Sequence, residues 1–520
     1  MRRNVVPLVV RGALILFFIC IVAVLAYNVA EYRSRYMFIA VLMAVVAMLL
    51  SFTNWRRVVP ILFAYVCIEG FISNLLYPKM LPLLFKDFVV ILIYLGFAGE
   101  VVLKKRTLLT RPIFIPLALF TALATVQVFN PGLRNVLVGL VGLKMYVFYL
   151  PLILVGYYYF HTLEDLRHFL GYLILLSLPV SLMAYYQYGG GWETIKGLNE
   201  RGFWRAEIYT AAAEGRMLRV PATFAVSGIF GAYAMVTLLI GAIYWAATPS
   251  SRARWIRLVM LLILATSLLL SGSRGALVIA GLALVALSFV RVQQRGAHGF
   301  ALMIAACVFF SVAMLGSAVQ GRLASLKRPE VYISRLEPAY LGTAKALSKN
   351  PWGNGTGSAT PQARHVRGAG GEPELGEEEE WRLVEKYVLK LAHELGALGL
   401  VLFTLVVFAF IWEAKRAFRQ LRTPEGKWLG VGVAFFVTLQ LLACYVALSL
   451  DTPPVNVYAW FFCGVMLRLP ELEAASIAAD ARTAAGFLRA REGGVLLPAE
   501  PPHVPMGPRP EGTPPSGLFL

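Results

Sequence analysis

Long apolar segments alternate with short polar segments along most of the chain. The apolar segments lie near residues 12–30, 36–53, 58–76, 84–103, 112–128, 137–158, 166–187, 220–247, 255–271, 275–290, 299–318, 395–412, 428–449 and 455–468. Most of them approach the roughly 20 residues that a helix needs to cross a bilayer, and they lack the alternation of a membrane β-barrel strand. The pattern therefore predicts an all-α, polytopic transmembrane protein with about 12 to 14 membrane-spanning helices.

Composition agrees with a membrane protein and excludes a soluble enzyme. Of the 520 residues, 58% are hydrophobic and only 15% are charged, and the mean hydropathy is +0.68. Soluble domains carry about 25% charged residues. The 48 Lys and Arg residues exceed the 29 Asp and Glu residues, which gives a net charge of +19. Because these basic residues lie mainly in short loops between apolar segments, they indicate membrane topology, and no nucleic-acid partner is expected.

The positions of the basic loops predict the face on which each loop lies. With a cytoplasmic N-terminus, the basic loops at 56–57, 104–106, 252–254, 291–295 and 415–427 all fall on the cytoplasmic side. The chain then divides into N-terminal helices in 1–187, an arginine-rich outer loop in 188–219, helices in 220–318, a large outer loop in 319–385, C-terminal helices in 386–468 and a disordered cytoplasmic tail in 469–520. The short turn at 271–275 falls on the same outer face as the two long loops. We expect the functional site on this face.

The large outer loop contains a predicted helix of its own. Leu336, Tyr340, Ala344 and Leu347 recur at helical spacing between polar residues, which predicts an amphipathic helix against the membrane surface that forms a lid or a rim. The tail, in contrast, begins rich in Ala and ends rich in Pro, Gly and Glu. This composition cannot bury a core, and we expect disorder there.

Arginines on the predicted outer face are the first candidate chemistry. The stretch SGSRGAL at 271–277 presents Arg274 at the end of a membrane helix. Its planar guanidinium suits the paired oxygens of a phosphate or diphosphate, although an arginine that reaches lipid phosphate is the alternative. The preceding outer loop carries Arg201, Arg205, Arg216 and Arg219. Positive charge normally stays on the cytoplasmic side, so this cluster indicates an anionic ligand, with a solvated loop at the lipid headgroups as the alternative.

Candidate proton acceptors lie where the large outer loop re-enters the membrane. Glu385 is at the outer end of the next predicted helix, where a carboxylate can accept a proton from a hydroxyl. The acidic run Glu377–Glu380 before it is typical of a solvated loop. His393, two turns further in, is the competing base. In the segment Pro351–Gly357, three alternate glycines favour a tight turn over a backbone cradle for a ligand.

Other chemistry is not indicated by the sequence. The six histidines do not pair at metal-ligand spacing, and Ala397 occupies the place of the second histidine of an HExxH motif that would start at His393. All five cysteines lie inside apolar segments, so no disulfide framework is indicated. We expect no metal site and no cofactor.

Taken together, the motifs resemble those of the O-antigen ligase and O-antigen polymerase superfamily of bacterial membrane glycosyltransferases, in its exopolysaccharide-polymerase branch. In chain order the similar motifs are Gly142-Leu143-Lys144 through Tyr149-Leu150-Pro151, Arg219 to Phe224, Ser271 to Leu277, Arg335-Leu336 with Asn350 to Gly357, and Glu394 to Gly399. Each motif is short and rich in glycine, so their order and spacing carry the resemblance, which spans about 85–470.

The resemblance implies an undecaprenyl-diphosphate-linked oligosaccharide as donor, transferred to an acceptor sugar hydroxyl on the periplasmic face of the bacterial inner membrane. It implies no metal, because Arg219 and Arg274 fall where family arginines hold the donor diphosphate and can offset its charge. It also implies a chain-length regulator and a flippase of the same pathway as possible partners.

Glu385 occupies the position at which ligases of this family carry a histidine proposed as the base. A glutamate there favours a polymerase, in which Glu385 deprotonates the acceptor hydroxyl for an inverting single displacement. Further candidates for contacts with lipid or sugar acids are Arg201, Arg205, Arg216, Arg335 and His393. Glu394, Gly396 and Gly399 are expected to serve helix entry and close packing.

Two alternatives stay open. One is a ligase that passes a finished glycan to lipid A core or to protein. The other is a flippase or transporter of lipid-linked sugars, for which the charged residues Lys86, Asp87 and Lys144 inside or at the edge of apolar segments are the argument.

Overall fold

A computed structural model describes most of the chain. The described residues are 54–75, 81–103, 110–133, 135–199, 209–212, 215–247, 254–292, 329–360, 363, 386–446 and 450–492. The predicted apolar segments near 12–30, 36–53 and 299–318 lie outside these ranges, apart from positions at their edges.

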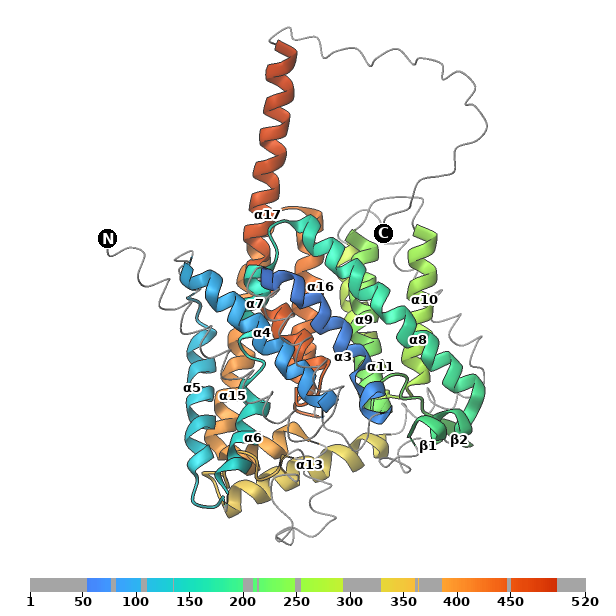
Figure 1. The fold of residues 1–520 in the computed structure, drawn as a ribbon, viewed down its shortest axis with the longest axis vertical. Coiled ribbons are helices and arrows are strands. Elements are labelled where there is room, and N and C mark those ends of the chain that lie inside the picture. Colours follow the sequence, from blue (N-terminus) through green and yellow to red (C-terminus); the bar gives the residue numbers. More distant parts are fainter. Residues whose placement is uncertain are drawn as a thin grey trace, which may run out of the picture. The chain divides into compact units, whose positions relative to one another are not determined.

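Helices make up almost all of the regular structure in the described ranges (Figure 1). The helices are α3 (Val58–Leu75), α4 (Leu81–Leu103), α5 (Phe114–Val126), α6 (Val136–Val147), α7 (Leu152–Tyr159), α8 (Leu163–Asn199), α9 (Ser227–Ala247), α10 (Arg254–Leu270), α11 (Arg274–Val292), α13 (Pro329–Lys349), α15 (Tyr387–Gln420), α16 (Pro424–Ala443) and α17 (Val455–Glu492). Short 3-10 helices, η2 (Trp55–Arg57) and η3 (Gln127–Phe129), precede α3 and follow α5.

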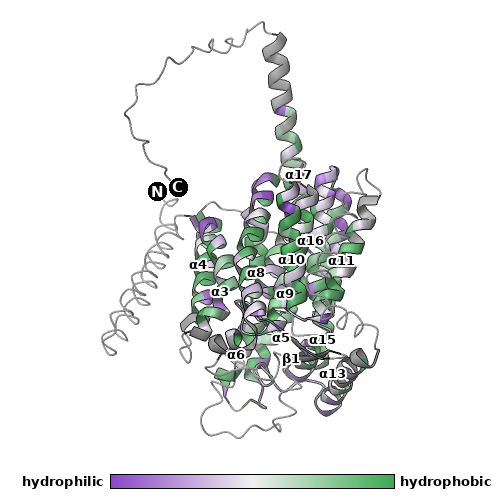
Figure 2. Ribbon diagram, turned by 90° about the vertical axis from the view of Figure 1, so that its right-hand side faces the viewer, coloured by the Kyte–Doolittle hydropathy of each residue, from purple (hydrophilic) through white to green (hydrophobic). Residues whose placement is uncertain are grey.

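Five helical stretches of the described residues are long and apolar enough to cross a membrane. They are Val136–Tyr159, Leu163–Gly191, Ser227–Trp245, Tyr387–Gln420 and Pro424–Ala443. Hydrophobic residues predominate along the helices of the bundle, and hydrophilic residues gather nearer its ends (Figure 2). The prediction of a helical membrane protein is therefore confirmed, while the number of spans stays a prediction.

Regular structure extends into the predicted arginine-rich loop. α8 continues to Asn199 through a non-helical Gly191, so the boundary at 188 is wrong. The strands β1 (Tyr209–Ala212) and β2 (Gly215–Leu218) follow as an antiparallel hairpin, with Ala211 opposite Arg216. The hydropathy pattern missed both, because the end of α8 is polar and each strand has only four residues.

The predicted amphipathic helix exists as α13, which packs against α15. On the predicted apolar face Tyr340 is 49% exposed, whereas Thr343 is buried and Ala346 packs against the cluster of Leu389 and Ala359. The small residues of α13 therefore contact the bundle, and larger apolar ones remain outside. The contact of this helix with a membrane surface stays a prediction. α13 and the β1–β2 hairpin lie at the same end of the bundle (Figures 1 and 2).

The bundle is centred on α9, which packs against α8, α10, α11 and α16. A compact unit covers Met1–Glu473, and a second begins at Ala474. The predicted start of a disordered tail at 469 is wrong, because α17 is helical as far as Glu492. The Ala-rich composition of this stretch favours a helix without any need for burial.

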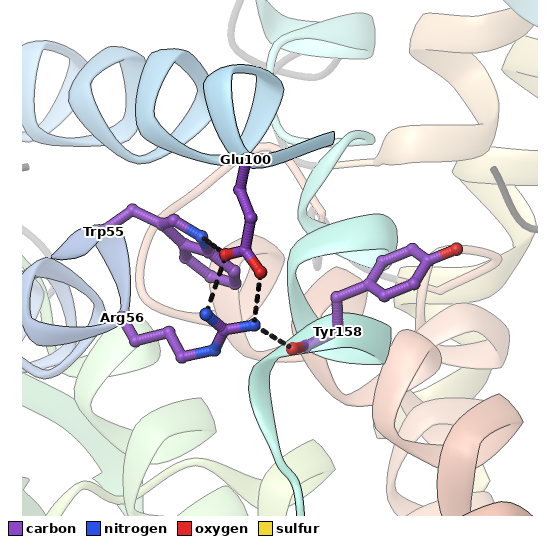
Figure 3. Close-up of polar contacts among 4 residues, drawn as sticks. All are labelled: Trp55, Arg56, Glu100 and Tyr158. Carbon is purple, nitrogen blue, oxygen red and sulfur yellow. Dashed lines mark hydrogen bonds and ion pairs between the residues drawn. The ribbon is translucent and has the colours of Figure 1, made fainter. Parts of the chain in front are cut away.

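One polar cluster joins η2, the end of α4 and α7 (Figure 3). Arg56 donates to both carboxylate oxygens of Glu100, at 2.7 and 3.3 Å, and to the carbonyl of Tyr158 at 3.1 Å. Trp55 Nε1 donates to the same carboxylate at 2.6 Å, and its ring lies 4.6 Å from the guanidinium carbon. Arg56, which the charge pattern placed in a basic loop, thus fastens three elements together.

Candidate functional site

The segment that begins with Arg219 lies directly on the turn Ser271–Arg274, hereafter the SGSR turn. Val220 N donates to Leu270 O at 3.2 Å, and Arg219 Nε donates to Ser271 O at 3.3 Å. Gly272 has a φ of 62°, and a Cβ there would lie 2.8 Å from Arg219 Cγ. Glycine at 272 therefore allows both the left-handed turn and the passage of the Arg219 side chain across it.

Arg274 begins α11 immediately after this turn. The turn rests on α9, because Gly231 leaves no Cβ between the two: an added one would lie 2.5 Å from Ser273 Cβ. Arg219 and Arg274 are both half-buried. The structure thus brings Arg219 onto the turn that leads into Arg274, although 55 positions separate them in sequence (274 − 219). A cationic side chain that crosses the turn before a helix N-terminus favours an anion there.

The segment after Arg219 is also fastened to α3. Thr223 Oγ1 donates to Cys67 O at 2.5 Å, and Phe71 N donates to Thr223 O at 2.7 Å. Gly70 permits this approach, since a Cβ there would lie 2.6 Å from Ala225 N. The motif Arg219 to Phe224 is therefore a non-helical segment, with a turn at its end, that is held between helices.

The residues 350–360, here called the glycine loop, dock on the start of α15. Gly353, Gly355 and Gly357 have φ values of 87°, 95° and 89°. The amides of Asn354 and Gly355 donate to the carbonyls of residues 393 and 394 at 2.8 and 3.1 Å. The favoured interpretation of a tight turn is thus confirmed, and these two amides are used within the protein.

α15 is shaped to receive the glycine loop. Gly396 interrupts the helix with a φ of 68°, and Ala397 N donates to Pro351 O at 2.8 Å. Glu394 is fully buried and its Oε1 accepts from Ala359 N and Thr360 Oγ1, each at 2.9 Å. The expected packing role of Glu394 and Gly396 is confirmed by these contacts.

His393 lies at the same contact. Its Nε2 is 3.3 Å from Asn354 Nδ2, and its Nδ1 is 3.2 Å from Ser358 Oγ. Because the Ser358 hydroxyl already donates to Gly355 O at 2.8 Å, we assign the ring proton to Nδ1 and the accepting lone pair to Nε2. Both ring nitrogens then engage the glycine loop. A role for His393 toward substrate stays a prediction.

Three residues further toward the start of α15, Lys390 forms a buried ion pair that sequence reasoning missed. Lys390 Nζ donates to Asp451 Oδ2 at 2.7 Å, and the two residues are 1% and 3% exposed. The ammonium also lies 4.5 Å from the ring centroid of Tyr146. Burial raises the pKa of Asp451, and the charge and hydrogen bond of Lys390 oppose that rise. The available signal was a lysine within an otherwise apolar stretch.

The charged residues behind the transporter alternative each have a partner of opposite charge within the bundle. Lys86 contacts Glu69, and Lys144 contacts Asp87, which also accepts from Tyr149 at 3.0 Å. These contacts join α3, α4 and the α6–α7 region. Such pairing is what stable burial of charges between helices requires.

The remaining predicted site residues are only partly described. Glu385, Arg201 and Arg205 lie outside the described residues, as does the acidic run before Glu385. Arg216 lies on β2 and Arg335 on α13, with only their backbones described. Their roles stay predictions.

Within the described ranges, no group of three or more His, Cys, Asp or Glu side chains could hold a metal ion. No protein-family model matches the sequence, and no curated protein matches it.

Proposed function

We propose that the protein is a polysaccharide polymerase of the bacterial inner membrane. It transfers a glycan from an undecaprenyl-diphosphate carrier to an acceptor sugar hydroxyl on the periplasmic face. The observation that carries this proposal is the placement of Arg219 across the SGSR turn that leads into Arg274. Two guanidinium groups beside a helix N-terminus suit a diphosphate, whose negative charge grows as the sugar leaves.

The location of this arginine pair supports the same proposal. The pair belongs to an apolar helical protein, so a lipid-linked donor can reach it from the bilayer. The β1–β2 hairpin leads directly into Arg219 and lies at the bundle end that also carries α13. In the proposed reaction Glu385 takes the acceptor proton, the hydroxyl oxygen bonds to the anomeric carbon, and the diphosphate leaves with the electrons of the broken C–O bond.

The test measures glycan chain length and lipid-linked sugars in a deletion strain that expresses each variant at matched level. We expect Arg219→Ala and Arg274→Ala to slow transfer roughly 100-fold, as loss of a charge-stabilising donor does in other enzymes. Single lipid-linked repeats should then accumulate. Arg57→Ala is the matched control, because Arg57 is an exposed arginine of the bundle. Normal polymer from both site variants would contradict the proposal.

The identity of the base is tested in the same strain. Glu385→Gln should block polymer formation, since an amide cannot accept the proton. His393→Gln should retain activity if His393 serves the glycine loop, because glutamine can still form hydrogen bonds there. Loss in His393→Gln with full activity in Glu385→Gln would assign the base to His393 instead.

The same strain separates the alternatives. A ligase would leave long lipid-linked polymer when it is deleted, and a polymerase would leave single repeats. A flippase would trap single repeats on the cytoplasmic side. The pairing of Lys86 with Glu69 and of Lys144 with Asp87 weakens the case for a flippase, because these charges have partners within the bundle.

A further inference from the structure

The backbone just after Arg219 adopts an unfavourable conformation. Ala222 has a φ of 53°, and it is the one non-glycine residue with a positive φ among the described residues. It lies inside a turn in which Phe224 N donates to Pro221 O at 3.0 Å. Left-handed conformation at this turn position normally selects glycine, asparagine or aspartate, because a Cβ crowds the following carbonyl.

A single side chain of α8 holds this turn from both sides. Gln187 Nε2 donates to Ala222 O at 2.9 Å, and Ala222 N donates to Gln187 Oε1 at 2.8 Å. Gln187 is 1% exposed and Ala222 is 4% exposed. A buried amide that satisfies the donor and the acceptor of one residue compensates for its strained conformation, since leaving either group unpaired in this interior is unfavourable.

The turn lies three residues from Arg219, so its conformation determines how the segment reaches the SGSR turn. Val220, which is fully buried and donates to Leu270 O, and Pro221 are the two residues that connect Arg219 to the Ala222 turn. If Ala222 adopted a right-handed or extended conformation, the chain direction before it would change, and with it the direction in which Arg219 leaves Val220. The position of the Arg219 guanidinium therefore depends on the turn that Gln187 stabilises.

We infer that Gln187 is a positioning residue, which fixes Arg219 toward an anionic diphosphate by holding Ala222 in its left-handed conformation. This inference rests on the proposed function, because it takes the ligand of Arg219 to be the donor diphosphate. It adds a residue of a different helix, α8, to the arginine pair.

The experiment measures binding of undecaprenyl diphosphate to the detergent-solubilised full chain. Gln187→Leu should weaken binding on the order of tenfold, the scale set by a left-handed non-glycine residue without support. Ala222→Gly in the Gln187→Leu background should restore most of the affinity, because glycine adopts a positive φ without a clamp. Gln440→Leu is the matched control, since Gln440 is an equally buried glutamine of α16.

Gln187→Met provides a second variant if the leucine variant does not fold. Its unbranched side chain fills nearly the same space but can neither donate to Ala222 O nor accept from Ala222 N through a strong acceptor, so we expect a similar loss of binding. The role of Gln187 is overturned if Gln187→Leu binds as the wild type does, or if Ala222→Gly fails to rescue it while gel filtration shows folded protein. Wild-type affinity in Arg219→Ala would instead overturn the donor assignment, and the inference with it.

Discussion

At the scale of single residues, the buried pair Lys390–Asp451 shows how this protein accommodates charge in an apolar bundle. Both groups are almost fully buried, and Lys390 also contacts the ring of Tyr146. Removal of two charges from water is expensive, and their attraction offsets this only while both are present. Each partner is therefore tolerated only while the other is present. The pair adds little to the free energy of unfolding beyond what two apolar residues would give.

Lys390→Met should destabilise the protein by about 3–5 kcal/mol, because it leaves the Asp451 carboxylate buried without its cation. Lys390→Met combined with Asp451→Leu should be less destabilised than the single variant. A thiol-reactive dye reports unfolding through Cys67, Cys444 and Cys463, whose side chains are all buried in the folded protein. An unfolding temperature of the double variant at or below that of the single would contradict this account.

At the scale of elements, glycines determine how closely α6, α15 and the glycine loop approach. A Cβ on Gly142 of α6 would overlap with the backbone of Gly357, and one on Gly357 would overlap with Val138 O. The obstructing atoms at both positions belong to the backbone, so they cannot move aside as the end of a flexible side chain could. The motif glycines thus act as contact surfaces between elements.

Gly142→Ala should displace the glycine loop from α6 and lower both thermal stability and polymer formation. We expect the free energy of unfolding to fall by about 1–3 kcal/mol or more, as in other overpacked cores. Gly99→Ala of α4 is the matched control: its Cβ meets nothing within 4 Å, and alanine favours a helix. Equal unfolding temperatures for the two variants would show that the contact tolerates a methyl group.

The sequence predicted the positions of helices but not the contacts and interruptions that determine how they pack. The apolar pattern located α3, α9, α10 and α11 to within a few residues at most ends. It did so because the residues that a helix buries in lipid or protein are the same apolar residues that form the pattern. It missed the interruptions at Gly191 and Gly396, of which the one at Gly396 receives the backbone of the glycine loop. For the candidate site, the resemblance implied that Arg219 and Arg274 hold one diphosphate. The structure places Arg219 on the turn that leads into Arg274, and their shared role stays a prediction. The clamp of Gln187 on Ala222 has no local signal, since it joins residues 35 positions apart.

At the scale of the whole molecule, the predicted faces can be tested by labelling. The basic loop before α16 is expected in the cytoplasm, and the loop that contains α13 is expected in the periplasm. Lys349 and Arg422 are exposed residues of these two regions. They are suitable positions for introduced cysteines, because neither lies in the apolar core.

In a cysteine-free background, Lys349→Cys should react with a membrane-impermeant maleimide in intact spheroplasts. Arg422→Cys should react only after the membrane is permeabilised. These outcomes are expected because Lys and Arg residues are enriched in cytoplasmic loops. Reaction of both positions in intact spheroplasts would contradict the predicted topology, and reversed labelling would place the arginine pair on the cytoplasmic face.

The Lys390–Asp451 pair also constrains how the protein is made. Its partners are 61 residues apart, and a ribosome adds roughly 5 to 20 residues per second. For several seconds, then, the nascent helix α15 carries a lysine whose carboxylate does not yet exist. A lone lysine at membrane depth opposes insertion. The start of α15 must therefore wait outside the lipid interior, or be shielded by earlier helices, until the turn with Asp451 emerges.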